Sequence, residues 1–199
     1  MAVKKSGLDE LERFQAGSRK QWRTWLERHH LTSPGVWLVT FKKETGKPRI
    51  DYEEAVEELL CFGWVDSKGM KLDDERSMLL CRPRSPKSAW SKPNKERVER
   101  LIAAGLMAPR GLEMVELAKQ RGTWDALNDV EALVEPEDLK ARLDRSANAR
   151  THWDAFPRSV KRAILDWIRN AKRPETRQKR IDETVTQAAK NVRANQWRQ

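Results

Sequence analysis

The chain has 199 residues, of which 38% are hydrophobic and 35% charged, with a formal net charge of +10. Nine tryptophans argue against a disordered chain, because each large ring needs an apolar place to pack and each indole N–H needs a partner. No run approaches the ~20 apolar residues that cross a bilayer, and the first residues lack the apolar core of a Sec signal peptide, so we expect a cytoplasmic protein.

The N-terminal part begins with three predicted elements. A short strand is expected at 11–15, and a helix at 18–29 whose first residue, Ser18, is an N-cap residue type. The large apolar residues of this helix recur at the spacing of one helical face, namely Trp22, Trp25 and Leu26. β-branched and aromatic residues then predict a strand over 36–44.

A second helix and a hairpin complete this part. Asp51 and Glu54 form a D-x-x-E capping box that predicts a helix start, and Gly63 ends the helix. Strands are expected over 64–73 and 76–84. The resulting order, β-α-β-α-β-β, predicts the α+β class: a small sheet with flanking helices on one face.

The pattern becomes helical after residue 90, with proline at helix starts and glycine after helix ends. Helices are predicted at 91–104, 109–122, 136–146, 147–156, 157–171 and from 174 onward. We therefore expect a sheet domain over 1–90 and a helical region over 91–199 packed on it. Two cysteines, Cys61 and Cys81, are too few for a disulfide framework or a zinc cluster and are expected to be buried as small apolar side chains.

The stretch 82–94, "RPRSPKSAWSKPN", is the main candidate site. It contains no acid, its prolines stiffen it, and it runs into a helix start, where free N–H groups favour phosphate. The predicted anion contacts in it are Arg82, Arg84, Lys87, Ser91 and Lys92. In the alternative, the stretch only joins the sheet to the helices, and Trp90 packs between them.

A second basic cluster lies in the last helix. Arg173, Arg177 and Arg180 are spaced i, i+4 and i+7, so they share one face and are candidate phosphate contacts. The alternative is a solvated face with Glu175 and Lys179 as an i, i+4 pair.

Pocket candidates come from the predicted strand at 64–73. Strand alternation puts Trp64, Asp66 and Lys68 on one face. The pocket candidates are Trp64, Asp66 and, from the basic loop, Trp90. In the alternative, Asp66 pairs with Arg82 or Arg84. No second carboxylate is fixed by spacing, so no catalytic residue is predicted, and no metal or cofactor motif is present.

Several motifs occur together and in order: "CFGWVDSKGMKLD" (61–73), "RPRSPKSAWSKPNKERVERL" (82–101), "GLMAP" (105–109), "AKQRGTW" (118–124), "PEDL" (136–139) and "AKRPETRQKRI" (171–181). In these the chain resembles the YdeI/OmpD-associated, or bacteriocin-protection, family over roughly 10–190. The resemblance implies a cytoplasmic protein linked to bacteriocin, antimicrobial-peptide or stress tolerance, and it supplies no catalytic residue.

The leading functional hypothesis is therefore a non-enzymatic binding protein that holds an anionic ligand through its basic loop. Two alternatives stay open. A nucleic-acid-binding protein would show affinity that falls steeply with salt. An enzyme acting on a small phosphorylated substrate would have a pocket containing Asp66 and Trp64. The oligomeric state and the ligand itself are not predicted.

Overall fold

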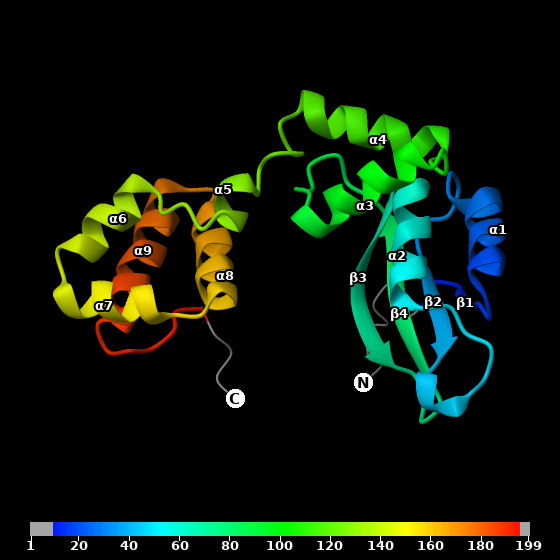
Figure 1. Ribbon diagram of the computed structural model, residues 1–199, viewed down its shortest axis with the longest axis horizontal. Helices are drawn as coiled ribbons and strands as arrows, with labels where there is room; N and C mark the ends of the chain where they lie inside the picture. The colour runs from blue at the N-terminus through cyan, green and yellow to red at the C-terminus, as the bar shows by residue number, and fades with distance from the viewer. Residues whose placement is uncertain (1–9, 196–199) are drawn as a thin grey trace, which may run out of the picture. The chain divides into compact units, whose positions relative to one another are not determined.

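The computed structural model describes residues 10–195 and divides the chain into two compact units, residues 1–125 and 126–199 (Figure 1). The N-terminal segment that was predicted to lack a signal-peptide core lies mostly outside the described residues. We predicted a division at residue 90, whereas the units meet at 125/126. The first unit is larger than expected because two helices that follow residue 90 pack on the sheet domain.

Four strands form the mixed sheet of the first unit, in the order β1-β2-β4-β3. They are β1 (Arg13–Gln15), β2 (Val36–Phe41), β3 (Trp64–Lys71) and β4 (Arg76–Pro83). β1 runs parallel to β2, and the other two pairs are antiparallel. β2 ends three residues earlier than predicted, because residues 43–45 form the short 3₁₀ helix η1 (Lys43–Thr45), followed by Gly46 in the left-handed region.

The helices of this unit are α1 (Arg19–His29), α2 (Tyr52–Cys61), α3 (Lys92–Ala103) and α4 (Pro109–Gln120). The predicted start signals are confirmed. The Ser18 hydroxyl accepts from the amide of Gln21, and Asp51 and Glu54 form the reciprocal capping box of α2. The α+β class and the element order β-α-β-α-β-β are thus confirmed.

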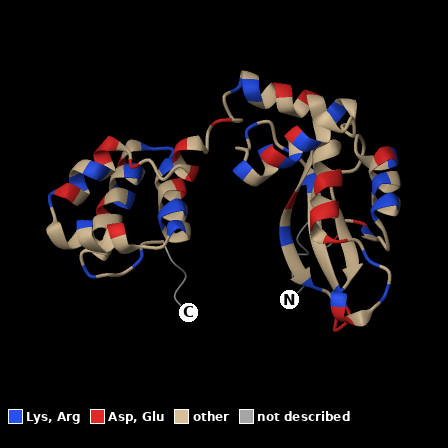
Figure 2. Ribbon diagram, in the orientation of Figure 1, with Lys and Arg blue, Asp and Glu red and all other residues tan. Residues whose placement is uncertain are grey.

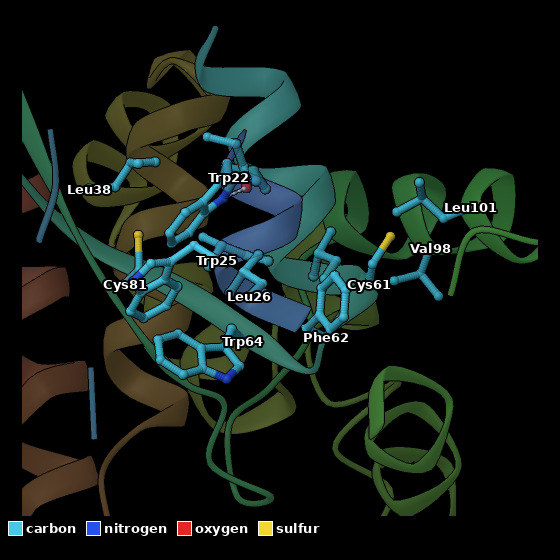
Figure 3. Close-up of a cluster of buried hydrophobic side chains, with 14 of the residues drawn as sticks. Trp22, Trp25, Leu26, Leu38, Cys61, Phe62, Trp64, Cys81, Val98 and Leu101 are labelled. Carbon is cyan, nitrogen blue, oxygen red and sulfur yellow. Dashed lines mark hydrogen bonds between the residues drawn. The ribbon is translucent and has the colours of Figure 1, made fainter. Parts of the chain in front are cut away.

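The core of the first unit lies where α1 and α2 cover one face of the sheet. Figure 3 shows Trp22, Trp25 and Trp64 close together, and the centroids of Trp22 and Trp25 are 5.3 Å apart. Cys61 and Cys81 lie in this core as buried free thiols, which confirms their predicted role. A smaller cluster lies on the other face of the sheet and contains Trp37, Val39, Met78 and Leu80.

A β-bulge in β3 changes which side chains share a face. Opposite residues of an antiparallel pair lie on the same face. Asp66 lies opposite Cys81, in the helix-covered core, whereas Lys68 lies opposite Leu80, on the other face, because the register shifts between Asp66 and Lys68. The prediction that Lys68 shares a face with Asp66 was therefore wrong. Simple alternation fails where one extra residue enters a strand.

The second unit is helical over its described part. It contains α5 (Asn128–Glu131), α6 (Glu137–Asp144), α7 (Ala147–Ala155), α8 (Arg158–Arg169) and α9 (Pro174–Ala188). Its own core is built around fully buried side chains such as Trp153, Leu139, Ile164 and Ile181. None of the helices among residues 10–195 is both long enough and apolar enough to cross a membrane.

Candidate functional site

The basic loop that joins β4 to α3 is shaped by a buried arginine. The guanidinium of Arg84 lies 3.8 Å from the ring centroid of Trp90 and donates from Nη2 to the carbonyl of Ala89 at 2.6 Å. A turn from Ser85 to Ser88 is closed by a backbone hydrogen bond of 3.0 Å. The loop thus has a defined conformation. It also joins the sheet to α3, and Trp90 packs in the core, as the structural alternative predicted.

Arg84 itself lies inside the loop. Only 5% of it is exposed, and its Nε has no hydrogen-bond partner among the described residues. Burial lowers the pKa of Arg84 to about 10, and the charge of Asp66 opposes that shift. Arg84 was predicted as a surface anion contact, but its side chain stabilises the loop from beneath instead.

Two other cations of the loop, Arg82 and Lys87, are exposed and have no acidic partner among residues 10–195. The stem of Arg82 lies against Gly35, where a Cβ would meet Arg82 Cγ at 2.9 Å. Gly35 also has a φ of +152°, so a larger residue there is doubly disfavoured. Arg82 is therefore held along its aliphatic part while its charged end stays in solvent.

The start of α3 lies at the end of this loop. Ser91 is the N-cap, and its side chain makes no capping hydrogen bond. The amides of Lys92 and Asn94 have no hydrogen-bond acceptor among the described residues, and Pro93 has no amide hydrogen. Free donors at the positive end of a twelve-residue helix favour an anion.

Most of the cations on α3 are paired with acids. Lys92 is 3.9 Å from Glu96, a weak contact, whereas three further cations of α3 form ion pairs. These are Lys95 with Asp125, Arg97 with Glu53 and Arg100 with Glu57. Figure 2 shows Lys or Arg and Asp or Glu interspersed along most helices of both units. The positive charge that the sequence gathers in 82–100 is therefore concentrated, in the structure, at Arg82, Lys87 and Lys92.

The second predicted cluster, on α9, is largely used inside its own unit. Arg177 donates from Nε and Nη2 to the two carboxylate oxygens of Asp138 at 2.7 and 2.9 Å. Arg180 lies over the ring of Trp167 and donates to the carbonyl of Trp167. Arg173 is exposed at the N-cap of α9. The three arginines do not form a row of free phosphate contacts, because two of them make contacts with other helices.

The pocket candidates separate in the structure. Trp64 is 1% exposed in the core, and its indole N–H donates to the carbonyl of His30 at 3.0 Å. Trp90 is equally buried beneath Arg84. Asp66 forms no ion pair within the described residues. Instead its carboxylate accepts from the hydroxyl of Tyr52 at 2.9 Å and lines an open cavity of about 640 Å³.

Family models match both units of the chain. Residues 14–114 match a model described as a domain of unknown function, DUF8412. Residues 132–191 match a model described as bacteriocin-protection, YdeI or OmpD-associated. The chain belongs to the DUF8412 family and carries a YdeI/OmpD-associated domain. No curated protein and no solved structure gives a significant match.

The predicted resemblance to the YdeI/OmpD-associated family is confirmed over part of the chain. The matched residues include α6 to α9, with the motifs at 136–139 and 171–181. The motifs at 61–73 and 82–101 instead fall in the DUF8412 region, which also holds the basic loop and the cavity. The two matched regions lie one in each compact unit.

The cavity of the DUF8412 region has three residues that sequence reasoning missed: Arg49, Tyr52 and Gly69. Tyr52 is the first residue of α2 and Arg49 lies in the loop before it, and neither position carries a sequence motif. Gly69 did carry a signal, since glycine inside a strand pattern marks a bulge or a close approach. What brings the three together is the sheet register, which no local motif encodes.

Proposed function

We propose that the DUF8412 region binds phosphate-type anionic groups at the basic loop, residues 82–94. One observation carries the proposal: exposed, unpaired Arg82 and Lys87 lie on a loop of fixed shape that leads into the uncapped start of α3. The role is binding and not catalysis, since the loop presents donors and charge but no acid or nucleophile arranged with a base.

The loop is already ordered in the free protein, which lowers the entropic cost of binding an anion. A flexible basic linker would lose the conformational entropy of several residues on closing around an anion. Here the stack of Arg84 on Trp90 and the bond to Ala89 fix the loop in the free protein. Arg82 and Lys87 then supply charge-assisted contacts, and the amides of Lys92 and Asn94 supply dipolar ones.

The YdeI/OmpD-associated domain gives this binding activity a proposed setting. Its description names bacteriocin protection, and we extend that to this chain as a proposed role in bacteriocin, antimicrobial-peptide or stress tolerance. The proposed location is the cytoplasm, as expected from the sequence, and cell fractionation with an antibody against the native protein tests it.

The proposal is tested with a fluorescein-labelled single-stranded 20-mer oligonucleotide and, separately, with inorganic pyrophosphate. Binding is measured by anisotropy for the oligonucleotide and by calorimetry for pyrophosphate, over a range of NaCl concentrations. The test variant is Arg82→Ala/Lys87→Ala. The charge-matched control is Arg28→Ala/Lys43→Ala, which removes one arginine and one lysine that are exposed elsewhere in the same unit.

The test variant is expected to lose pyrophosphate binding, and the control to keep it. If the oligonucleotide binds as well, the slope of log K against log salt should fall by about 1.4 in the test variant, because each lost single-strand phosphate contact removes about 0.7. Oligonucleotide binding without pyrophosphate binding would favour the nucleic-acid alternative. Equal losses in both variants would refute a site at the loop.

A further inference from the structure

The cavity on the helix-covered face of the sheet is a second candidate site, separate from the basic loop. It lies within the first unit, between the start of α2 and the strands β2, β3 and β4. Its volume of about 640 Å³ falls in the ~300–1,000 Å³ range of small-molecule sites. The residues of this cavity are separate from those of the loop, so a ligand here does not require an anion at the loop.

A glycine of β3 lines the cavity on its strand side and adds no side chain to it. The register shift after Asp66 places Gly69 opposite Leu79, whose side chain packs against the core under the helices. A Cβ built on Gly69 would meet no atom within 4 Å. Any side chain at this position would therefore point into open space, and glycine leaves that space free for a ligand.

The walls of the cavity are mainly apolar. They include Leu38 of β2, Ile50 before α2, Ala55 of α2 and Leu79 of β4, which all belong to or pack against the core on the helix-covered face. Such walls fit an aromatic or branched apolar body, since burying apolar surface is the main source of small-ligand affinity.

Two polar groups in the cavity have unused hydrogen-bonding capacity. Asp66 accepts from Tyr52 through Oδ2 only, and it has no cationic partner within ion-pair distance among residues 10–195. Burial and the nearby Asp66 carboxylate raise the pKa of Tyr52 to about 12, so the hydroxyl stays protonated and donates. A carboxylate has about four acceptor positions, so Asp66 can also accept from a ligand.

Arg49 supplies the complementary donor. Its Nη2 is 2.6 Å from Asp51 Oδ1, which neutralises its charge. Its Nε is buried and has no partner among the described residues. A buried donor without an acceptor is costly, so a rotation of the Arg49 side chain that brings Nε to a ligand acceptor at the cavity wall would be favourable.

We propose that this cavity binds a small molecule with an apolar body and a neutral head that both donates and accepts, as a primary amide does. The head donates an N–H to Asp66 and accepts from Arg49 Nε. A carboxylate ligand would be repelled by Asp66, and an amine would leave Arg49 Nε unsatisfied.

The test uses three matched probes, 4-phenylbutanamide, 4-phenylbutyrate and 4-phenylbutylamine, added to the ¹⁵N-labelled full-length protein. The amide probe is expected to shift the backbone signals of Tyr52, Asp66 and Gly69, with a dissociation constant of about 2 mM at typical ligand efficiency. The acid and the amine are expected to bind at least threefold more weakly. Equal or tighter binding of either one would overturn the proposed head group.

A filled-cavity variant separates binding from folding. Gly69→Leu is expected to abolish the shifts while the protein melts at the same or a higher temperature, because its Cβ meets no atom and leucine favours a strand over glycine. Asp66→Asn keeps the Tyr52 contact and is expected to remove the discrimination against 4-phenylbutyrate. Unchanged binding in Gly69→Leu, or no shifts with the wild-type protein, would refute a ligand site in this cavity.

Discussion

At the residue scale, Glu58 of α2 is the clearest buried charge in the first unit. Only 2% of it is exposed, and its carboxylate accepts from Arg19 Nε at 2.6 Å and from Arg23 Nη1 at 2.9 Å. The two arginines reach Glu58 from α1, so the three side chains join α1 to α2. The α1–α2 pair is thus held by a charge cluster as well as by tryptophans.

Glu58→Ala should lower the free energy of unfolding by about 2 kcal/mol. That is less than the ~3–5 kcal/mol for breaking a fully buried pair, because the side chains of Arg19 and Arg23 stay 33% and 31% exposed. Urea denaturation followed by tryptophan fluorescence measures it. Glu27→Gln, which breaks only the exposed pair with Arg23, should change stability by less than ~0.5 kcal/mol. Equal effects of the two variants would contradict a buried cluster.

Glu135 gives the second unit a pH-dependent stability. Hydrogen bonds from Arg150, and another from the indole of Trp153, lower the pKa of Glu135 below its ordinary 4.5. Since the folded pKa is depressed, this stabilisation is fully present above about pH 4.5 and is lost as the pH falls through the folded value.

Glu135→Gln should therefore flatten the decline in stability below pH 4.5 and cost about 1–2 kcal/mol at pH 7. The measurement is the urea midpoint of amide signals from α6 to α9 at pH 7, 5, 4 and 3. Glu137→Gln, at an exposed position of the first turn of α6, serves as the control. A variant that declined with pH as steeply as the wild type would contradict this role of Glu135.

Single residues were the least predictable part of the site. Sequence alone counts Arg82, Arg84 and Lys87 as equal cations, whereas the structure buries Arg84 under the loop and leaves the other two in solvent. The difference comes from the position of Trp90, which a linear pattern does not give. Arg177 was likewise predicted as free, because its partner Asp138 lies 39 positions away in the sequence.

At the element scale, local signals predicted most of the fold. Caps, prolines and glycines mark the ends of nearly every helix because these residues act through their own backbone. The strand order β1-β2-β4-β3 and the bulge in β3 were not predicted, since both depend on which strand pairs with which. The cavity depends on that register and so could not be found from the sequence.

The packing of α4 on the end of α2 gives an element-scale prediction. A Cβ on Gly111 would lie 2.2 Å from the carbonyl oxygen of Cys61, far inside contact distance. Gly111→Ala should destabilise the first unit by about 2 kcal/mol, despite the better helix propensity of alanine, because the helix backbone must move away. Glu113→Ala, on an exposed position of α4, is the control. Unchanged stability of Gly111→Ala in thermal denaturation would contradict close packing of the two helices.

At the scale of the whole molecule, each compact unit has its own hydrophobic core. Residues 1–125 and 126–199, expressed separately, should each unfold in one cooperative urea transition, because a cluster of buried side chains suffices for independent folding. The check is circular dichroism of each fragment beside the full chain. A fragment without a cooperative transition would show that its core depends on the other unit.

The most direct test of the proposed loop site is to locate the residues that pyrophosphate contacts on the protein. Pyrophosphate is titrated into the ¹⁵N-labelled full chain, and the backbone amide signals are followed. If the loop binds the anion, the largest shifts are at Lys92 and Asn94, with smaller ones at Arg82 and Lys87, and all are lost in Arg82→Ala/Lys87→Ala. Shifts centred on α9, or shifts that survive in the variant, would contradict a binding site at the loop.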